Sequence, residues 1–409
     1  MNKIFNFDAN KLVEKYGTPL YVYNKETIID NYQKLKSSFQ KYYPKTDVHY
    51  AVKANTNLAI LKILEEEGAS VDCSSPFELL TSEKAGFTSE KIMYTGNYES
   101  ISDLEAAVKS KATINLDDIS SLKRLLSFHL PERISFRINP GIGRGGFEGI
   151  VTGGTDAKFG VPYEDASKAY KLAQINGIKR FGIHMMTGSN NLEPYYFAEI
   201  VDKLLTIAGK VFEQLGTQPE YVDIGGGFGI PYHDEEIPLN LELTAQLVSE
   251  EFREKCKKYN LGSPRLKIEP GRYIAANAGY LLSKVTGTKS SYKKFVGIDS
   301  GMNTLLRPAL YGASHQHFIL GKDTATEPVN LCGRICENSD IFAKHIYLPE
   351  AELGDIVITK DAGAYGYAMA SNYNGRLRPA EVLIDQGRDK LIRKRETLKN
   401  LFNLYPEDL

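Results

Sequence analysis

From residue 48 to residue 270, short apolar runs alternate with segments that carry apolar residues at helical spacing. Eight runs rich in β-branched and aromatic residues are predicted as strands: 48–53, 70–75, 92–95, 113–118, 134–140, 180–185, 221–227 and 265–270. Strict alternation of strands and helices indicates parallel strands joined by crossover helices. Eight such units match a closed (β/α)8 barrel, the TIM barrel, and an open doubly wound sheet is the alternative that the pattern leaves.

After about residue 280 the pattern changes to β-rich runs separated by turn residues. Short strands in such a series are typical of an all-β domain of the sandwich or barrel kind. We therefore expect a barrel over residues 31–275 and a β domain over residues 276–409. A helical pattern returns at the end of the chain, where we predict a helix over 388–403.

Composition and charge favour a small-molecule ligand. The chain has 409 residues, 42% of them apolar, which suits about two folded domains. Lys and Arg number 50 and Asp and Glu 51, and this net charge of −1 argues against a nucleic-acid partner, which would favour a basic face. No apolar run approaches ~18 residues, so we expect no membrane span. The N-terminus lacks the apolar core of a signal peptide.

The cysteines and histidines give no metal-site pattern. Cys73, Cys256, Cys332 and Cys336 form no CxxC pair, so neither a zinc knuckle nor a thioredoxin-type motif is indicated. His315 and His317 have no third ligand type at convincing spacing, and we expect no metal. Free thiols fit a reducing compartment, which predicts a cytoplasmic protein.

Polar residues stand where the predicted strands end. These ends carry Lys53, Asp72, Asn97, Asp117, Arg137, Asn139, the segments 184–189 and 225–229, Glu269 and Arg272. In barrels of this type the functional groups gather where strands end and βα loops begin. Polar residues are common at any strand end, but their recurrence at strand after strand favours a ring-shaped site.

Lys53 has a chemical use at such a strand end. A buried ammonium is costly, so a lysine that ends a buried strand needs a reason to be there. A lysine in a barrel mouth can form a Schiff base with an aldehyde. Lys53, in HYAVKANTN, is therefore a candidate for covalent catalysis.

Two further motifs suit the same cofactor. The amides of Gly225 to Gly229 in DIGGGFG can form a phosphate nest, although a tight turn is the alternative and the dinucleotide-binding spacing G-x-G-x-x-G is missing. Glu269 in IEPGR can bond a protonated ring nitrogen, and Arg272 can hold a substrate acid group, with a buried ion pair as the alternative. A lysine, a phosphate nest and a carboxylate are the set that pyridoxal 5′-phosphate needs.

These residues lie in motifs that resemble the fold-type III pyridoxal-phosphate decarboxylases, among them the diaminopimelate decarboxylases. The motifs are YAVKAN, VDCSSPFEL, RINP, KFG, GS at 188–189, DIGGGFG, EPGR, RPALYGA, CEN-SD at 336–340 and DAGAYGYAMASNYNGRLRPAEVL. They extend from about residue 15 to residue 385. The resemblance implies an alanine racemase/decarboxylase-like architecture, in which residues 1–30 join the β domain. It also implies a homodimer with two active sites shared between subunits.

The resemblance also implies residue roles. The expected cofactor contacts are Lys53, Asp72, Met186, Ser189, Gly225, Gly226, Gly227, Gly229, Glu269 and Tyr365. The expected substrate contacts are Arg272, Arg307, Tyr311, Glu337 and Tyr365. Cys336 would be the proton donor, and it would come with Glu337 from the neighbouring subunit. A thiol pKa of ~8.5 suits that transfer near neutrality, although a free cysteine is more commonly a small buried apolar residue.

Three positions depart from the family pattern. Met186 stands where the family usually has a histidine that stacks on the pyridoxal ring; a thioether can also lie against an aromatic face, but it donates no hydrogen bond. Phe147 and Glu148 stand where relatives often have histidines, and Arg334 stands where proline is frequent. These changes bear on the substrate more than on the type of reaction.

We predict an enzyme that decarboxylates an amino acid whose far end carries both charges, with meso-diaminopimelate as the leading substrate and L-lysine as the product. The arginines would hold the remote acid group and Glu337 the remote ammonium. One alternative is a decarboxylase for a related amino acid in a specialised pathway. A second is a non-catalytic protein that binds the cofactor, which would be expected to lose Lys53 or Cys336. An amino-acid racemase typically has an arginine at the position of Glu269.

Overall fold

The computed structural model describes residues 3–4, 7–141, 152–324 and 326–407. The chain divides into two compact units. The barrel unit comprises Ile29–Pro231 and Ile237–Ile274, and the sheet unit comprises Met1–Ile28, Tyr232–Glu236 and Ala275–Leu409.

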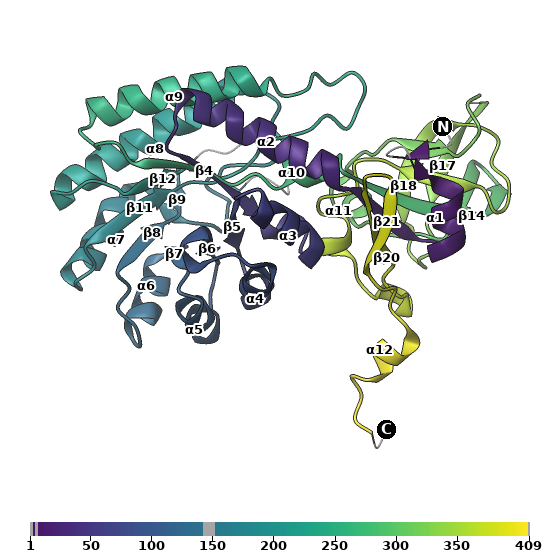
Figure 1. Cartoon of the computed structure of the whole chain (residues 1–409), viewed down its shortest axis with the longest axis horizontal. Helices are drawn as coiled ribbons and strands as arrows, with labels where there is room; N and C mark the ends of the chain where they lie inside the picture. Colours follow the sequence, from purple (N-terminus) through teal and green to yellow (C-terminus); the bar gives the residue numbers. More distant parts are fainter. Residues whose placement is uncertain (1–2, 5–6, 142–151, 325, 408–409) are drawn as a thin grey trace. The chain divides into compact units, whose positions relative to one another are not determined.

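Within the described residues, the barrel unit contains a closed barrel of eight parallel strands (Figure 1). The strands are β4 (Thr46–Ala51), β5 (Ser70–Cys73), β6 (Ile92–Thr95), β7 (Thr113–Leu116), β8 (Arg133–Phe136), β11 (Arg180–His184), β12 (Tyr221–Asp223) and β13 (Arg265–Ile268). Consecutive strands pair with each other, and β13 closes the ring on β4 with Ile268 opposite Val48. The predicted TIM barrel is therefore confirmed over the open sheet, since an open sheet would leave two unpaired edges.

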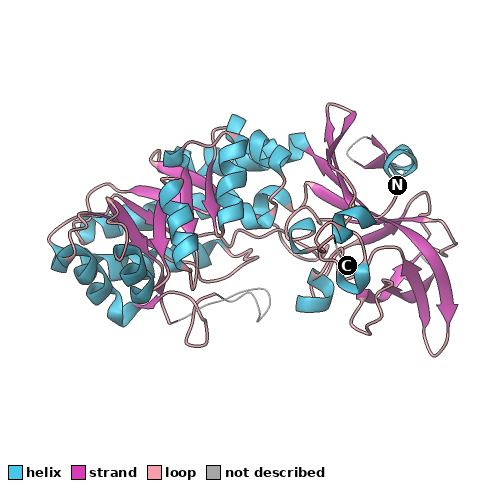
Figure 2. Ribbon diagram, turned by 90° about the horizontal axis from the view of Figure 1, so that it is seen from below, coloured by secondary structure: helices cyan, strands magenta, loops and turns pink. Residues whose placement is uncertain are grey.

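Helices surround the strands of the barrel unit, as Figure 2 shows. They are α3 (Leu58–Glu66), α4 (Pro76–Ala85), α5 (Ile101–Lys109), α6 (Ile119–Leu126), α7 (Ala166–Ile175), α8 (Pro194–Leu215), α9 (Leu241–Lys258) and the short α10 (Arg272–Ala275), preceded by α2 (Lys25–Tyr42). Side-chain caps begin several of them: Asn57 accepts a hydrogen bond from the Ala59 amide at 2.9 Å, and Ser100 forms a capping box with Asp103. These caps fix where each βα loop ends, and so where a strand-end side chain lies.

The sheet unit is built on a nine-stranded mixed sheet, counted over the described part of the chain. Its strands are β3 (Leu20–Asn24), β14 (Gly279–Ser290), β15 (Lys294–Ile298), β16 (His317–Ile319), β17 (Glu327–Cys332), β18 (Ile341–Leu348), β19 (Ile356–Thr359), β20 (Ala380–Asp385) and β21 (Arg388–Arg393). β3 lies between β14 and β20, with Leu20 opposite both Leu282 and Ala380. The segment before the barrel is therefore a central part of this sheet.

The core of the sheet unit explains why β3 is held there. Leu20 and Val22 of β3 are fully buried in one apolar cluster with Leu282, Ile358 and Val382. Leu12 and Val13 of α1 (Ala9–Tyr16) pack into the same cluster. Burying these side chains in one cluster favours a single register for β3, because a shift of one residue would move them to the opposite face of the sheet, where Tyr21 and Tyr23 are buried.

The predicted helix over 388–403 is wrong for its first half. Residues Arg388–Arg393 form strand β21, which pairs antiparallel with β20 and sets Leu391 opposite Val382. Helix α12 is limited to Leu398–Phe402. Pairing with a neighbouring strand, which the local sequence does not reveal, outweighs the helical pattern here.

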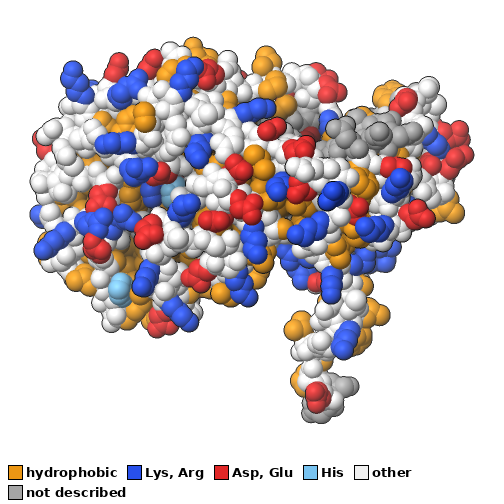
Figure 3. Space-filling model, viewed as in Figure 1, with side chains coloured by type: hydrophobic (Ala, Val, Ile, Leu, Met, Phe, Trp, Pro, Cys, Tyr) orange, Lys and Arg blue, Asp and Glu red, His pale blue; other side chains and the backbone are white. Residues whose placement is uncertain are grey.

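The surface carries both signs of charge. On the face in Figure 3, Lys and Arg side chains are interspersed with Asp and Glu side chains. Among the helices of the described residues, none combines the length and the apolar character that a bilayer crossing requires.

Candidate active site

Lys53 lies one turn beyond β4. The strand ends at Ala51, two residues earlier than predicted, and Val52–Ala54 form a turn of 3₁₀ helix. The Lys53 Nζ donates a hydrogen bond of 2.9 Å to Oδ2 of Asp72, which lies on β5. The lysine side chain is 44% exposed, whereas the Asp72 side chain is fully buried. The ammonium therefore keeps an accessible face while a buried carboxylate fixes its position.

Asp72 is suited to exchange a proton with this lysine. Burial raises the pKa of Asp72 above its usual range, and the charge of Glu269 raises it further. The ion pair with Lys53 acts in the opposite direction. An amine beside a carboxyl group of raised pKa can be neutral when it has to act as a nucleophile.

Glu269 follows β13 and is 5% exposed. His184, the last residue of β11, has its Nε2 3.4 Å from Oε2 of Glu269. Burial opposes ionisation, but the electrostatic interaction and the hydrogen bond with His184 hold the pKa of Glu269 down, at about 2. The other oxygen, Oε1, is buried and has no hydrogen-bond partner among the described residues. An ionised buried carboxylate with a free oxygen is built to receive a further donor.

Two more ionisable groups extend this cluster. Asp223 of β12 brings a carboxylate oxygen within 4.8 Å of a ring nitrogen of His184 and of a carboxylate oxygen of Glu269. Burial raises the pKa of Asp223 well above its usual range, and Glu269 raises it further. Lys267 lies with its Nζ 4.0 Å from the Tyr221 ring centroid, and burial lowers its pKa to about 8. Neighbouring carboxylates resist ionising together, so the ionised form of Glu269 disfavours ionisation of Asp223.

The glycines of 225–229 bring bare backbone beside Glu269. Gly225 and Gly227 have φ angles of +70° and +96°, a region that side chains rarely adopt. A Cβ on Gly226 would lie 2.3 Å from the backbone oxygen of Glu269, and one on Gly229 would lie 2.8 Å from the carbonyl carbon of Asn190. Glycine is therefore required at these positions, and a phosphate group can approach the amides closely.

Met186 contacts this loop, and Ser189 contacts Arg272. The Gly226 amide donates to the Met186 Sδ at 3.2 Å. The thioether thus contacts the loop directly, and its stacking on a pyridoxal ring stays a prediction. Arg272 NH2 donates to the Ser189 Oγ at 3.1 Å, which joins an expected substrate contact to an expected phosphate contact.

The residues of the barrel unit fit pyridoxal 5′-phosphate. Lys53 offers an accessible amine, Glu269 a buried oxygen without a partner in the described part of the chain, and Gly226 a backbone that no side chain can cover. These groups lie at the ends of β4 and β13 and in the loop after β12. Parallel strands β12, β13 and β4 are neighbours, so the three groups share one end of the barrel.

The sheet unit holds the second set of predicted residues, and one of them is Arg307. Arg307 begins α11 (Arg307–Tyr311) and is 2% exposed. Its NH1 lies 2.9 Å from the His315 Nε2, and its guanidinium carbon lies 4.5 Å from the Tyr232 ring centroid. Tyr311 ends the same helix.

Glu337 and Cys336 lie in the loop after β17. Both oxygens of Glu337 accept hydrogen bonds, one from the Tyr373 hydroxyl at 2.6 Å and one from the Ser339 hydroxyl at 2.7 Å. These bonds lower the pKa of Glu337, which keeps it ionised. Cys336 is exposed. The Glu337 carboxylate therefore has a fixed orientation, and the neighbouring Cys336 thiol is accessible.

Tyr365 carries backbone strain. Its φ angle is +55°, and left-handed backbone in a bulky residue is often associated with a functional constraint. The participation of Tyr365 and the other sheet-unit residues in the site with Lys53 stays a prediction. Phe147 and Glu148 lie outside the described residues.

Sequence reasoning missed three contributors. It gave no role to Asp223 or Lys267, although Lys267 lies on β13 only two residues before Glu269. It considered His315 only as a metal ligand, whereas the structure sets it against Arg307. The alternation of inward residues along β13 was the available signal; His315 had none.

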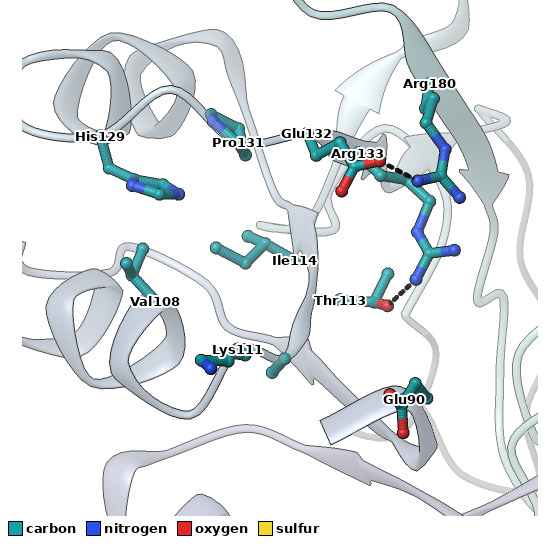
Figure 4. A pocket seen from close by; sticks show the side chains of 11 residues that line it. Glu90, Val108, Lys111, Thr113, Ile114, His129, Pro131, Glu132, Arg133 and Arg180 are labelled. Carbon is teal, nitrogen blue, oxygen red and sulfur yellow. Dashed lines mark hydrogen bonds and ion pairs between the residues drawn. The ribbon is translucent and has the colours of Figure 1, made fainter. Parts of the chain in front are cut away.

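A pocket of about 400 Å³ lies near the N-terminal ends of β7 and β8 (Figure 4). Four of its polar groups form two pairs: the Arg133 NH2 donates to the Thr113 Oγ1 at 2.6 Å, and Arg180 pairs with Glu132. Functional groups in such barrels lie at the opposite, C-terminal ends of the strands. We therefore do not count this pocket with the candidate site.

Comparisons with known proteins agree with the geometry. Residues 27–276 match the family model described as "Pyridoxal-dependent decarboxylase, pyridoxal binding domain". The chain is 44% identical to the diaminopimelate decarboxylase of Methanothermobacter thermautotrophicus, covering 96% of this chain and 93% of that protein. It is 34% identical to Protein TabA of Pseudomonas amygdali pv. tabaci, covering 95% and 91%. A crystal structure of diaminopimelate decarboxylase from Helicobacter pylori complexed with L-lysine has a TM-score of 0.91 and 32% identity, covering 98% of this chain and 100% of that one.

Proposed function

Because the chain belongs to the family of pyridoxal-dependent decarboxylases, we propose that its substrate is meso-diaminopimelate and that its products are L-lysine and CO2. The resemblance seen in the sequence motifs is confirmed, and the protein is a pyridoxal-phosphate-dependent carboxy-lyase. The observation that carries the choice of substrate is the 44% identity, over nearly the full length of both chains, to a diaminopimelate decarboxylase.

The test is a panel of diamino and dicarboxylic amino acids, scored for CO2 release with each product identified. We expect meso-diaminopimelate to have the highest kcat/KM and to yield L-lysine. A second candidate is a related amino acid of a specialised pathway, which the 34% identity to Protein TabA and the unusual Met186 favour. A different preferred substrate in the panel would select that candidate.

Pyridoxal 5′-phosphate, when bound, supplies an electron sink for the pair released as the substrate carboxylate leaves. Lys53, Ser189, Glu269 and Tyr365 would hold it, together with the glycine loop 225–229. The Lys53 Nζ exchanges a proton with the Asp72 Oδ2, 2.9 Å away, which frees the amine as a nucleophile. Glu269, kept ionised by His184, would bind a protonated ring nitrogen of the cofactor. The Cys336 Sγ then delivers a proton to the carbon that has lost CO2.

The same proposal assigns recognition of the far end of the substrate. Arg307, with Arg272 and Tyr311, binds the remote carboxylate, because a guanidinium can hold a carboxylate through two parallel hydrogen bonds. Glu337 binds the remote ammonium. Support comes from the burial of Arg307 and from the two hydroxyl groups that aim Glu337.

Replacing Arg307 with leucine is expected to lower kcat/KM for meso-diaminopimelate by ~10- to 150-fold. A lost charge-assisted contact costs about 1.5–3 kcal/mol, and that range sets the expected factor. Activity on a poor substrate without the distal acid, such as L-lysine, should hardly change. Steady-state kinetics on both substrates measure the ratio, and Arg388→Leu, at an exposed arginine of the same unit, is the matched control. Equal losses on both substrates would contradict the role of Arg307.

We also propose a homodimer in which Cys336 and Glu337 serve the active site of the partner subunit. Support comes from the exposed loop that carries both residues, since an accessible thiol can reach another chain. A cytoplasmic location is part of this proposal, because all four cysteines are free thiols and thiols persist in a reducing compartment.

Mixing Lys53→Ala with Cys336→Ala protein is expected to restore activity that neither variant has alone. Random exchange makes half of the dimers mixed, each with one intact site of two, so about a quarter of wild-type activity should return. The measurement is activity after subunit exchange, verified by native mass spectrometry with one variant carrying a mass tag. If exchange is complete and activity stays at the level of the separate variants, the site is not shared.

A further inference from the structure

His315 is held in one tautomer. It is 6% exposed, and its Nδ1 lies 2.8 Å from the backbone oxygen of Lys360. A carbonyl oxygen only accepts hydrogen bonds, so the Nδ1 carries the hydrogen. In the neutral ring the Nε2 is then a lone-pair acceptor, and it lies 2.9 Å from the Arg307 NH1. Arg307 therefore donates to His315, an arrangement that the carbonyl of Lys360 dictates.

The Arg307 guanidinium is restrained on two sides. Besides the bond to His315, its carbon atom lies 4.5 Å from the ring centroid of Tyr232. The rings of Tyr232 and His315 meet edge to face, with centroids 5.3 Å apart and an interplanar angle of 76°. The three side chains form one packed group within the sheet unit, which we call the Arg307 clamp. A guanidinium stacked on one face and tied at one nitrogen has a fixed orientation.

We propose that His315 is a positioning residue that sets the selectivity of the enzyme for a distal carboxylate. It acts through Arg307, by fixing the orientation in which the guanidinium meets an acid group. The proposal rests on the proposed function in one respect, the assignment of Arg307 to the distal acid. A planar, preoriented guanidinium loses less freedom on binding than a mobile one, so the clamp favours a substrate with that acid over one without it.

The alternative is that His315 only fills space in the core of the sheet unit. If His315 only fills space, its replacement lowers the stability of the protein, and the activity on all substrates falls by the same factor. A positioning role predicts a loss confined to substrates with a distal acid, and recovery by a side chain that restores the acceptor. Glutamine meets that requirement, because its carbonyl oxygen can accept from Arg307 while its amide group donates to the Lys360 oxygen.

The test is a double-mutant cycle on the holoenzyme with meso-diaminopimelate and L-lysine as substrates. His315→Phe keeps a ring beside Tyr232 and removes the acceptor. We expect its KM for meso-diaminopimelate to rise about 5- to 20-fold with kcat within about 2-fold of wild type. The reason is that Arg307 loses the hydrogen bond to His315 that orients it, while its own contact with the substrate is weakened only through that loss. Activity on L-lysine should change by less than about 2-fold, and His315→Gln should recover most of the KM.

The cycle is completed with Arg307→Leu and the double variant His315→Phe, Arg307→Leu. If His315 acts through Arg307, the double variant is no worse than Arg307→Leu alone, because the two losses are not additive. Additive losses, or an equal loss on both substrates, overturn the proposal. If His315→Phe does not fold, as judged by its thermal midpoint, Tyr232→Leu tests the second restraint and should show the same selective rise in KM.

Failure of the proposed function is distinguishable from failure of this inference. If wild-type enzyme prefers another amino acid to meso-diaminopimelate, the proposed substrate is wrong. The cycle is then run on the preferred substrate, where non-additivity between positions 315 and 307 still supports the clamp and additivity still overturns it.

Discussion

Replacing Lys53 with alanine is expected to lower kcat on the order of 10⁴-fold, the scale on which groups of covalent catalysis act. The variant should also lose the visible absorbance of a lysine-bound pyridoxal. The physical reason is that the Lys53 Nζ is the accessible amine fixed by the buried Asp72 at one end of the barrel. Absorbance spectra and steady-state kinetics measure the two effects.

Lys62→Ala is the matched control for this variant, since Lys62 is an exposed lysine on the neighbouring helix α3. It should keep both the absorbance and the turnover of the wild type. Borohydride reduction followed by peptide mapping identifies the lysine that carries the cofactor. A label on any lysine other than Lys53 would show that the assignment is wrong.

Replacing Glu269 with glutamine is expected to lower kcat by about 10²- to 10³-fold, as removal of a preorganised electrostatic group does. Glutamine keeps the size of the side chain and an acceptor oxygen, but it removes the negative charge that His184 stabilises. A protonated ring nitrogen would then lack its counter-charge. Turnover and the absorbance spectrum of the bound cofactor, each followed over pH, report the change.

Asp223→Asn provides a comparison within the same buried cluster. Burial raises the pKa of Asp223 and so favours its protonated form, which asparagine resembles. Asparagine can also keep the hydrogen bond of 2.9 Å from the Gly225 amide to the Asp223 Oδ1. We expect a loss of less than about 10-fold, below the range for a catalytic electrostatic group. A loss as large as that of Glu269→Gln would mean that Asp223 carries the essential charge.

The barrel could be predicted from the sequence alone, because the spacing of the apolar residues and the alternating order of strands and helices are both visible there. The runs around Tyr50, Met93 and Tyr221 are each short and apolar, and only parallel pairing accommodates a helix after every one of them. A polar residue at the end of such a strand, such as Lys53 or Glu269, follows from the same reasoning. The shift of Lys53 onto a 3₁₀ turn does not, since no turn residue in the local sequence marks the end of the strand at Ala51.

Contacts between distant segments could not be predicted from local patterns. His184 meets Glu269 across 85 residues, and His315 meets the Lys360 oxygen across 45. Strand β21 forms because Val382 and Leu391 pair across a hairpin, against the helical pattern of the surrounding residues. In each case the deciding partner becomes visible only when the chain is folded.

The central place of β3 has a consequence for synthesis on the ribosome. β3 is made before the barrel, but its partners β14 and β20 follow the barrel, and the pairing of Leu20 with Ala380 spans almost the whole chain. Contacts of such sequence separation form slowly, and domains generally fold as units during synthesis. The nascent chain therefore carries an unpaired apolar strand, Leu20–Asn24, while the barrel is being completed. An N-terminal fusion or deletion disturbs the sheet that assembles last. The resulting loss of stability falls on the unit that carries Arg307 and Cys336.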